Sequence, residues 1–235
     1  GDAMALHLPG PAKITGEPRL LDEWEAKRRL AEFGLRVPEG RRVTGVDAPA
    51  AASEIGFPVV LKAVGPDLAH KTEAGAVALG LGSEAAVAAA VAEITARLAA
   101  GSGGGDGFLV ERMVPDAVAE LIVGVKRDPA FGLALVLGSG GVLVELLRDS
   151  ATLLLPTDRA AVNEALSGLK GAPLFTGFRG RPKGDREALI DAVMAVAAFA
   201  EAHRESLVEL DVNPLLVLPE GQGAVAVDAL IRLSD

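Results

Sequence analysis

Apolar positions recur along this chain with two different periods, and these periods predict both helices and strands. In residues 59–64, VVLKAV, all positions but Lys62 are apolar and three are β-branched valines, as is typical of a buried strand. Further along, Val87, Val91, Ile94 and Leu98 fall at spacings of four, three and four. Such spacing places the four side chains on one side of a helix that faces a core.

Capping residues mark where the helices begin and end. Asp22, followed three residues later by Glu25, forms a capping box, and Gly34 ends the helix expected over about 23–33. Other helices are expected over 48–55 after Asp47, and in longer segments after Ser83, Asp158 and Asp185.

Strands dominate the second half of the sequence. Strands are expected at 76–81, 108–114, 118–125, 131–137 and 142–146, and again within roughly the last fifty residues. The turns between strands of the second half are too short to hold crossover helices. The order therefore favours an α+β protein of two lobes over a doubly wound sheet.

Composition restricts the class of protein. The 235 residues are 50% hydrophobic and 23% charged, which suits one large folded domain or two closely packed lobes. The net charge of −9 argues against a nucleic-acid surface, and the lack of cysteine excludes disulfides and thiolate metal sites. With no secretory signal and no apolar run of about 18 residues, we expect a cytoplasmic protein without a membrane partner. Residues 1–19 are expected to be a leader, in which Gly1 to Met4 resemble a remnant of expression.

One residue in the predicted 59–64 strand and one in the loop after it have side chains suited to phosphate chemistry. Lys62 at the end of an apolar strand is suited to hold a phosphate as a fixed positive charge. His70, one of three histidines, follows in a polar loop beside Lys71, and neutral imidazole attacks phosphorus near pH 7. On these residues alone, a lysine reaching solvent from an edge strand and a solvated histidine are the preferred interpretation.

A second group of polar residues lies near the end of the chain. Glu209, Asp211 and Asn213 alternate within an extended segment, so their side chains share one face. If 219–222 is a four-residue hairpin loop, counting back along both strands places Asn213 opposite Asp228. Opposed residues have Cβ atoms about 4.5–5.5 Å apart, close enough to share one ion. Carboxylate and amide oxygens of this kind are suited to bind Mg²⁺. We therefore favour a Mg²⁺ site over the alternative interpretation, in which these residues form a solvent-facing polar edge.

Several longer motifs together resemble one known family. The motifs cover residues 20–40, 58–75, 119–132, 138–156, 177–182, 209–217 and 226–229. The chain is similar to the ATP-grasp subunit or domain of the ADP-forming acyl-CoA synthetases, of the acetyl-CoA synthetase type. More distantly, the two ends of the chain resemble the nucleotide-binding lobe of succinyl-CoA synthetase β subunits. The resemblance implies an ATP-grasp fold, in which two α+β lobes enclose a nucleotide cleft. The smaller lobe is expected at about 40–115, and the larger at about 20–39 plus 116–235.

The resemblance also implies site residues and cofactors. Lys62 matches a lysine on the phosphates of ATP or ADP, and Glu120 matches an acidic residue on the ribose. The backbone segment expected at the adenine is Glu111, Arg112, Met113 and Val114. Asn213 and Asp228 match Mg²⁺ ligands, with Asp211 as a nearby acidic candidate. His70 matches the histidine that relays phosphate to a partner; Ala76 departs from the family, where a second glycine is more frequent.

The expected function is therefore the nucleotide half of reversible acyl-CoA synthesis, an acid–CoA ligase reaction that forms ADP. The acyl and CoA sites are expected in a CoA-binding α subunit of a hetero-oligomer, or in fused domains. Two alternatives remain. One is a carboxylate–amine ligase, which would not need His70, and the other is a regulatory ATP-grasp domain of a fused protein acyltransferase.

Overall fold

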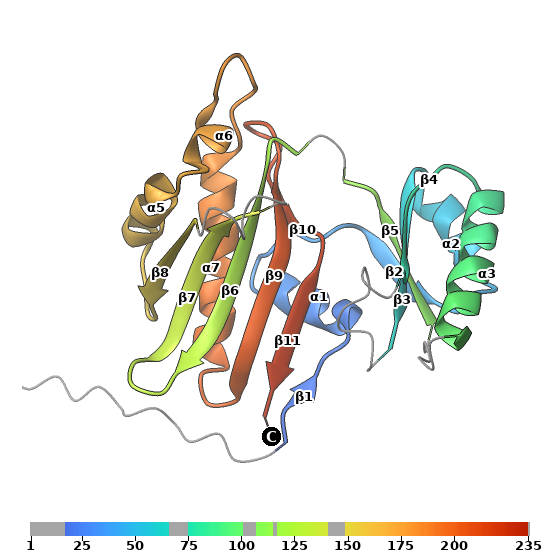
Figure 1. Cartoon of the computed structure of the whole chain (residues 1–235), viewed down its shortest axis with the longest axis horizontal. Helices are drawn as coiled ribbons and strands as arrows, with labels where there is room; N and C mark the ends of the chain where they lie inside the picture. Colours follow the sequence, from blue (N-terminus) through green and yellow to red (C-terminus); the bar gives the residue numbers. More distant parts are fainter. Residues whose placement is uncertain (1–16, 66–74, 101–106, 115–116, 141–148, 235) are drawn as a thin grey trace, which may run out of the picture.

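The computed structural model describes residues 17–65, 75–100, 107–114, 117–140 and 149–234 (Figure 1). Within these ranges the chain forms two β-sheets, and each sheet has its own helices and apolar core. The predicted strand at 142–146 and the residues His70 and Lys71 lie outside the described residues. None of the described helices is both long and apolar enough to cross a membrane.

The smaller sheet has four strands in the order β2-β5-β3-β4. Its elements are β2 (Gly40–Val43), α2 (Ala48–Ile55), β3 (Val59–Val64), β4 (Val77–Leu81), α3 (Glu84–Ala100) and β5 (Gly107–Arg112). Helices α2 and α3 pack against each other and cover one face of the sheet (Figure 1). Val87, Ile94 and Leu98 are buried as predicted, while Ala90 is buried in preference to the half-buried Val91.

Within the described residues, the larger sheet has seven strands, in the order β1-β11-β9-β6-β7-β8 with β10 paired to β9. Its strands are β1 (Arg19–Leu20), β6 (Ala119–Asp128), β7 (Gly132–Ser139), β8 (Ser150–Leu154), β9 (Leu207–Val217), β10 (Ala224–Ala226) and β11 (Ala229–Leu233). The helices beside it are α1 (Glu23–Ala31), α5 (Arg159–Gly168), α6 (Ala172–Thr176) and α7 (Arg186–Ala202). Helix α7 runs along one face of the sheet (Figure 1), where Val193 and Phe199 are fully buried.

Every pairing between the described strands is antiparallel. This arrangement confirms the predicted α+β class, because short connections join antiparallel neighbours directly. Helix α1, although near the start of the chain, packs on the larger sheet against β11 and α7. On this packing we propose the division expected from the sequence, with a smaller lobe at about 40–115 and a larger one at about 20–39 plus 116–235.

Most predicted element boundaries agree with the structure. Helix α2 and strand β3 have the expected bounds, whereas α1 ends at Ala31, two residues earlier than expected. Asp22, Asp158 and Asp185 each accept a hydrogen bond from the backbone three residues later, as N-caps do. Asp47 lies at the N-cap position of α2, as expected, but its carboxylate makes no capping hydrogen bond. It accepts a hydrogen bond from the Thr44 hydroxyl at 2.7 Å instead.

Candidate active site

A cavity of about 230 Å³ is lined by residues from both sheets. The smaller sheet and its connection to the larger one contribute Pro38, Val60, Lys62, Leu79, Glu111, Arg112, Met113 and Val114. The larger sheet and its loops contribute Glu120, Pro214, Leu216 and Val227. All six residues that the sequence assigns to nucleotide contact therefore meet at one cavity, although they come from three strands and a connecting segment.

The connection between the lobes is held by backbone hydrogen bonds. The N–H of Arg112 donates to the carbonyl of Glu39 at 2.8 Å, and the N–H of Met113 donates to the carbonyl of Pro58 at 3.1 Å. The guanidinium of Arg112 also pairs with the Glu39 carboxylate at 3.0 Å. Two of the N–H groups expected to face adenine are thus already engaged within the protein.

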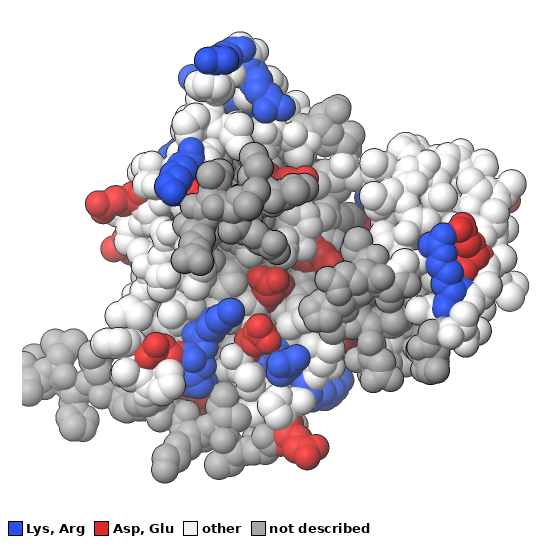
Figure 2. All heavy atoms as spheres, viewed as in Figure 1, with Lys and Arg blue, Asp and Glu red and all other residues white. Residues whose placement is uncertain are grey.

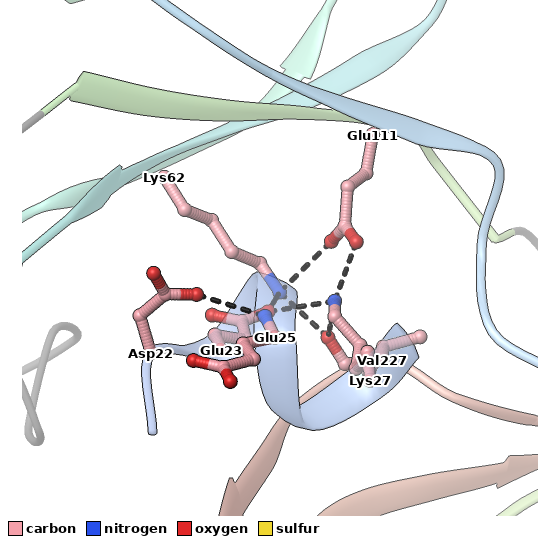
Figure 3. A network of polar contacts seen from close by, with 7 residues as sticks. All are labelled: Asp22, Glu23, Glu25, Lys27, Lys62, Glu111 and Val227. Atoms are coloured by element: carbon pink, nitrogen blue, oxygen red, sulfur yellow. Dashed lines mark hydrogen bonds and ion pairs between the residues drawn. The ribbon is translucent and has the colours of Figure 1, made fainter. Parts of the chain in front are cut away.

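Lys62 is 7% exposed, and its ammonium group contacts three acceptors among the residues that the structure describes. Its Nζ donates to Oε1 of Glu23 at 2.6 Å and to the carbonyl of Val227 at 2.6 Å, and it lies 3.2 Å from Oε2 of Glu111 (Figure 3). Lys62 lies on β3 of the smaller sheet, while Glu23 is on α1 beside the larger one. The expected phosphate lysine is therefore part of an ion pair that joins the lobes.

Lys27 on α1 uses the same acceptors. Its Nζ lies 2.7 Å from Oε1 of Glu23 and donates to Oε1 of Glu111 at 2.5 Å and to the carbonyl of Val227 at 3.0 Å (Figure 3). The side chains of Glu23, Lys27 and Glu111 are each at most 3% exposed. Two ammonium groups and two carboxylates thus form one buried ion cluster, which we call the clasp: Glu23, Lys27, Lys62 and Glu111.

The protonated state of Lys62 follows from its surroundings. Burial disfavours the charged ammonium and by itself lowers the pKa, but the carboxylates of Glu23, Glu111 and Asp228 outweigh this effect. The net result is a pKa raised above the ordinary value of lysine. Lys62 therefore carries a positive charge at the wall of the cavity at neutral pH.

Sequence reasoning missed Glu23 and Lys27. At the start of α1, only the capping pair Asp22 and Glu25 was considered. The available signal was periodic: positions 23, 26, 27 and 30 lie on one side of a helix, and all four are buried. An acid and a base, four residues apart on a side that also carries Leu30, indicate a buried ion pair.

The predicted pairing of Asn213 with Asp228 is confirmed by the register. β10 and β11 both pair with β9 in the register that the four-residue loop predicts, from Ala224 opposite Val217 to Ala229 opposite Val212. Between these two pairs, the N–H of Asn213 donates to the carbonyl of Asp228 at 3.2 Å.

A register shift in β9 changes which residues face the cavity. β6 pairs with β9 with a shift between Leu121 and Val123. Leu210 and Val212 lie in the core, but so do Leu215 and Val217, so the alternation of faces changes between them. Pro214 and Leu216 line the cavity as a result.

Asp211 is a half-buried carboxyl whose pKa is raised above its ordinary value. Burial is the main cause that raises the pKa of its carboxyl, and the Glu209 carboxylate adds to the effect, while Lys126 and a hydrogen bond from Asn213 oppose it. Figure 2 shows carboxylates near the middle of the visible face, over the larger sheet beside the smaller lobe. The oxygen donors of Asp211, Asn213 and Asp228 fit Mg²⁺ when phosphate and water supply further ligands. Among the described residues, no three His, Cys, Asp or Glu side chains are grouped to hold a metal ion by themselves.

The histidines differ in what the structure describes of them. His70 and His7 lie outside the described residues. His203 is the residue after α7, its Nδ1 lies 2.9 Å from the carbonyl of Phe199, and its ring stacks on the Phe199 ring at 4.1 Å. These contacts give His203 a structural role at the end of the helix.

Comparison with known proteins agrees with this architecture. Residues 13–233 match the model of the ATP-grasp domain family. The β subunit of an ADP-forming acetate–CoA ligase II from Pyrococcus furiosus is 35% identical over 214 residues, which are 90% of this chain and 90% of that subunit. A trans-feruloyl-CoA synthase from an unknown prokaryotic organism is 37% identical over 227 residues. The match covers 95% of this chain but 31% of that synthase, so the chain spans about a third of its length.

A solved structure is similar over nearly the whole chain. It is the dinucleotide-forming acetyl-coenzyme A synthetase 1 of Ca. Korarchaeum cryptofilum with coenzyme A and Mg-AMPPCP, and its phosphohistidine segment points towards the nucleotide-binding site. The TM-score is 0.78 at 35% identity, and the match covers 92% of this chain and 93% of that one. The fold and family expected from the sequence are confirmed. The chain belongs to the ATP-grasp family, within the group that contains the β subunits of ADP-forming acetate–CoA ligases.

Proposed function

We propose that this chain binds Mg²⁺–ATP or Mg²⁺–ADP in the cavity between its lobes and transfers a phosphoryl group between the nucleotide and His70. The observation that carries this proposal is the meeting of Lys62, Glu120 and the 111–114 segment at one cavity. In the complete reaction, acyl-CoA, ADP and phosphate are converted reversibly into free acid, CoA and ATP.

The residues at the cavity have complementary tasks. Lys62, protonated and at the cavity wall, stabilises negative charge on the phosphates. Glu120 on β6 lines the same cavity and accepts hydrogen bonds from the ribose hydroxyls. Because the N–H groups of Arg112 and Met113 are engaged, we assign the edge of adenine to Val114 and to the carbonyls of this segment.

Asn213 and Asp228 are proposed to hold the metal, with Asp211 close by. The cross-strand pairing of the first two supports this assignment, as does the raised pKa of Asp211, which bound positive charge would lower. When bound, Mg²⁺ supplies charge neutralisation to the phosphates.

His70 is proposed to be the phosphate relay. Its neutral imidazole attacks the γ-phosphorus of ATP, a new P–N bond forms, the bond to ADP breaks, and ADP keeps the bonding electrons. The support is the sequence match at His70 and the phosphohistidine segment named for the Korarchaeum enzyme, which points towards the nucleotide site of that protein.

A CoA-binding partner is proposed to complete the reaction. The Pyrococcus relative is called a β subunit, and the feruloyl-CoA synthase is about three times as long as the matched region. We therefore propose that an α subunit in a hetero-oligomer, or fused domains, provides the acyl and CoA sites. A cytoplasmic location, expected from the sequence, stays a prediction.

Calorimetric titration of the chain with ADP and ATP tests the nucleotide site. We expect both nucleotides to bind in the presence of Mg²⁺ and to bind more weakly after chelation of the metal. Failure of both nucleotides to bind in the presence of Mg²⁺ would overturn the proposed function.

A further inference from the structure

Lys27 is buried behind the cavity wall and contacts the same three residues as Lys62: Glu23, Glu111 and Val227. It is 1% exposed and does not line the cavity, whereas Lys62 and Glu111 do. Both lysines donate to the carbonyl of Val227, both lie within 2.7 Å of Oε1 of Glu23, and each contacts a different oxygen of Glu111. Any displacement of Lys27 therefore alters the surroundings of Lys62.

The charge of the clasp depends on Lys27. Glu23 and Glu111 bring two negative charges, and Lys27 and Lys62 bring two positive charges, so the four side chains are neutral together. Without Lys27, two buried carboxylates would share the single charge of Lys62 at the wall of the cavity. A phosphate entering the cavity would then meet a net negative cluster.

Lys27 also contacts the chain that leads to the candidate metal ligand. Val227, whose carbonyl accepts from Lys27 at 3.0 Å, directly precedes Asp228. The same lysine on α1 thus holds Glu111 on β5 and the segment that carries Asp228 (Figure 3). One buried ammonium group is thus in contact with the partners of Lys62 and with the peptide before Asp228.

We propose that Lys27 is a positioning residue for nucleotide phosphates: it balances the charges of Glu23 and Glu111, so that these carboxylates do not offset the attraction of Lys62 for the phosphates, and it fixes the peptide before Asp228. This inference rests on the proposed nucleotide site. Lys27 acts through Lys62, Glu111 and Val227, without touching the nucleotide.

The first test replaces Lys27 by methionine, which keeps the length of the side chain and removes its charge. In Lys27→Met, Mg²⁺–ATP and Mg²⁺–ADP should bind about tenfold more weakly or worse, because one nearby charge is worth at least this much at an effective dielectric of about 20. Adenosine, which has no phosphate, should bind within about twofold of the wild type. A role that is only structural would weaken all three ligands alike.

A matched control lies on the same helix. Arg29 pairs with Glu25 at 2.6 Å with the same spacing of four residues, but both side chains are about one-third exposed. Arg29→Met removes one positive charge from α1 without entering the clasp and should leave the affinity of all three ligands unchanged. Thermal unfolding of each variant reports whether it folds.

A compensating variant keeps the inference testable even if Lys27→Met does not fold. Lys27→Met with Glu111→Gln removes one charge of each sign and should bind ATP more tightly than Lys27→Met alone. Glu111→Gln alone should bind ATP about tenfold more tightly than this double variant, with equal binding of adenosine. Wild-type ATP affinity in Lys27→Met, or equal ATP affinity in Glu111→Gln and the double variant, would overturn the inference. If wild-type protein binds neither ATP nor ADP, the proposed function itself is wrong.

Discussion

Lys27 and Lys62 come from different lobes and share one carboxylate oxygen, Oε1 of Glu23, at 2.7 and 2.6 Å. Such an arrangement places like charges close together, and contacts of both lysines with Glu111 and with the Val227 carbonyl offset their repulsion. A phosphate that binds Lys62 must therefore compete with protein acceptors that already surround it.

Replacement of Lys62 by methionine tests this cluster directly. Lys62→Met leaves the carboxylates of Glu23 and Glu111 with Lys27 alone, and removal of one partner from a buried ion pair costs on the order of 3–5 kcal/mol. We expect a lower free energy of unfolding in urea together with loss of Mg²⁺–ATP binding. The control is Lys183→Met, at an exposed lysine away from the cavity, which should change neither quantity. Unchanged ATP affinity in a folded Lys62→Met variant would remove Lys62 from the phosphate site.

Asp228 is expected to act through Mg²⁺. In Asp228→Asn, the backbone pairing with Asn213 is retained, but one carboxylate ligand is lost. The affinity for ATP should fall by about tenfold in the presence of Mg²⁺, as expected when one charged ligand is neutralised. With the metal chelated, the variant should bind at least as well as the wild type. Titrations with and without Mg²⁺ measure both quantities.

The control for Asp228 lies in the same hairpin. Glu220 is exposed at the turn between β9 and β10, so Glu220→Gln removes a carboxylate without altering the cavity. It should leave both titrations unchanged. If Asp228→Asn responds to Mg²⁺ as the wild type does, the metal assignment is wrong.

The raised pKa of Asp211 predicts that the stability of the protein depends on pH. The pKa of this carboxyl is raised in the folded state, with burial as the main cause, so the folded protein holds this proton more tightly than the unfolded chain does. The associated stabilisation is complete below the pKa of the unfolded chain, about 3.9, and is lost as pH rises through the folded-state pKa. Asp211→Asn should lack this contribution.

Urea unfolding at a series of pH values, with and without Mg²⁺, measures this effect. Without metal, the wild type should lose stability relative to Asp211→Asn as pH rises through the folded-state pKa of Asp211. Near neutral pH, Mg²⁺ should reduce the difference in stability between the two proteins. Parallel stability profiles for the two proteins would show that Asp211 does not retain a raised pKa in the folded protein.

The sequence predicts the fold where local patterns and packing agree. Strand β3 is apolar throughout and central in its sheet, and its predicted bounds match the structure. The pairing of Asn213 with Asp228 follows from hairpin counting because no register shift interrupts β10 and β11 until Arg232. The residues of the nucleotide site lie far apart in sequence, so only the family resemblance predicts that they meet at one cavity.

Other features depend on contacts that no local pattern encodes. The clasp requires α1 to lie against β3 and β5, and helical periodicity indicates only that Glu23 and Lys27 are buried, without giving their partners. The register shift in β9 arises in its pairing with β6. Counting residues along the hairpin of β9 and β10 gives no information about that pairing. The engaged N–H of Arg112 likewise depends on Glu39, which is distant in sequence.

The relay through His70 separates an acyl-CoA synthetase from a carboxylate–amine ligase, and phosphate labelling tests it most directly. The chain, alone and with its CoA-binding partner, is incubated with Mg²⁺ and ATP labelled at the γ-phosphate, and protein-bound label is followed in acid and in base. A phosphohistidine should be lost in acid and stable in base, and His70→Ala and His70→Asn should carry no label while binding ATP as the wild type does. Equal labelling of wild type and His70→Ala, or no label on a wild type that binds Mg²⁺–ATP in the presence of its partner, would contradict the account.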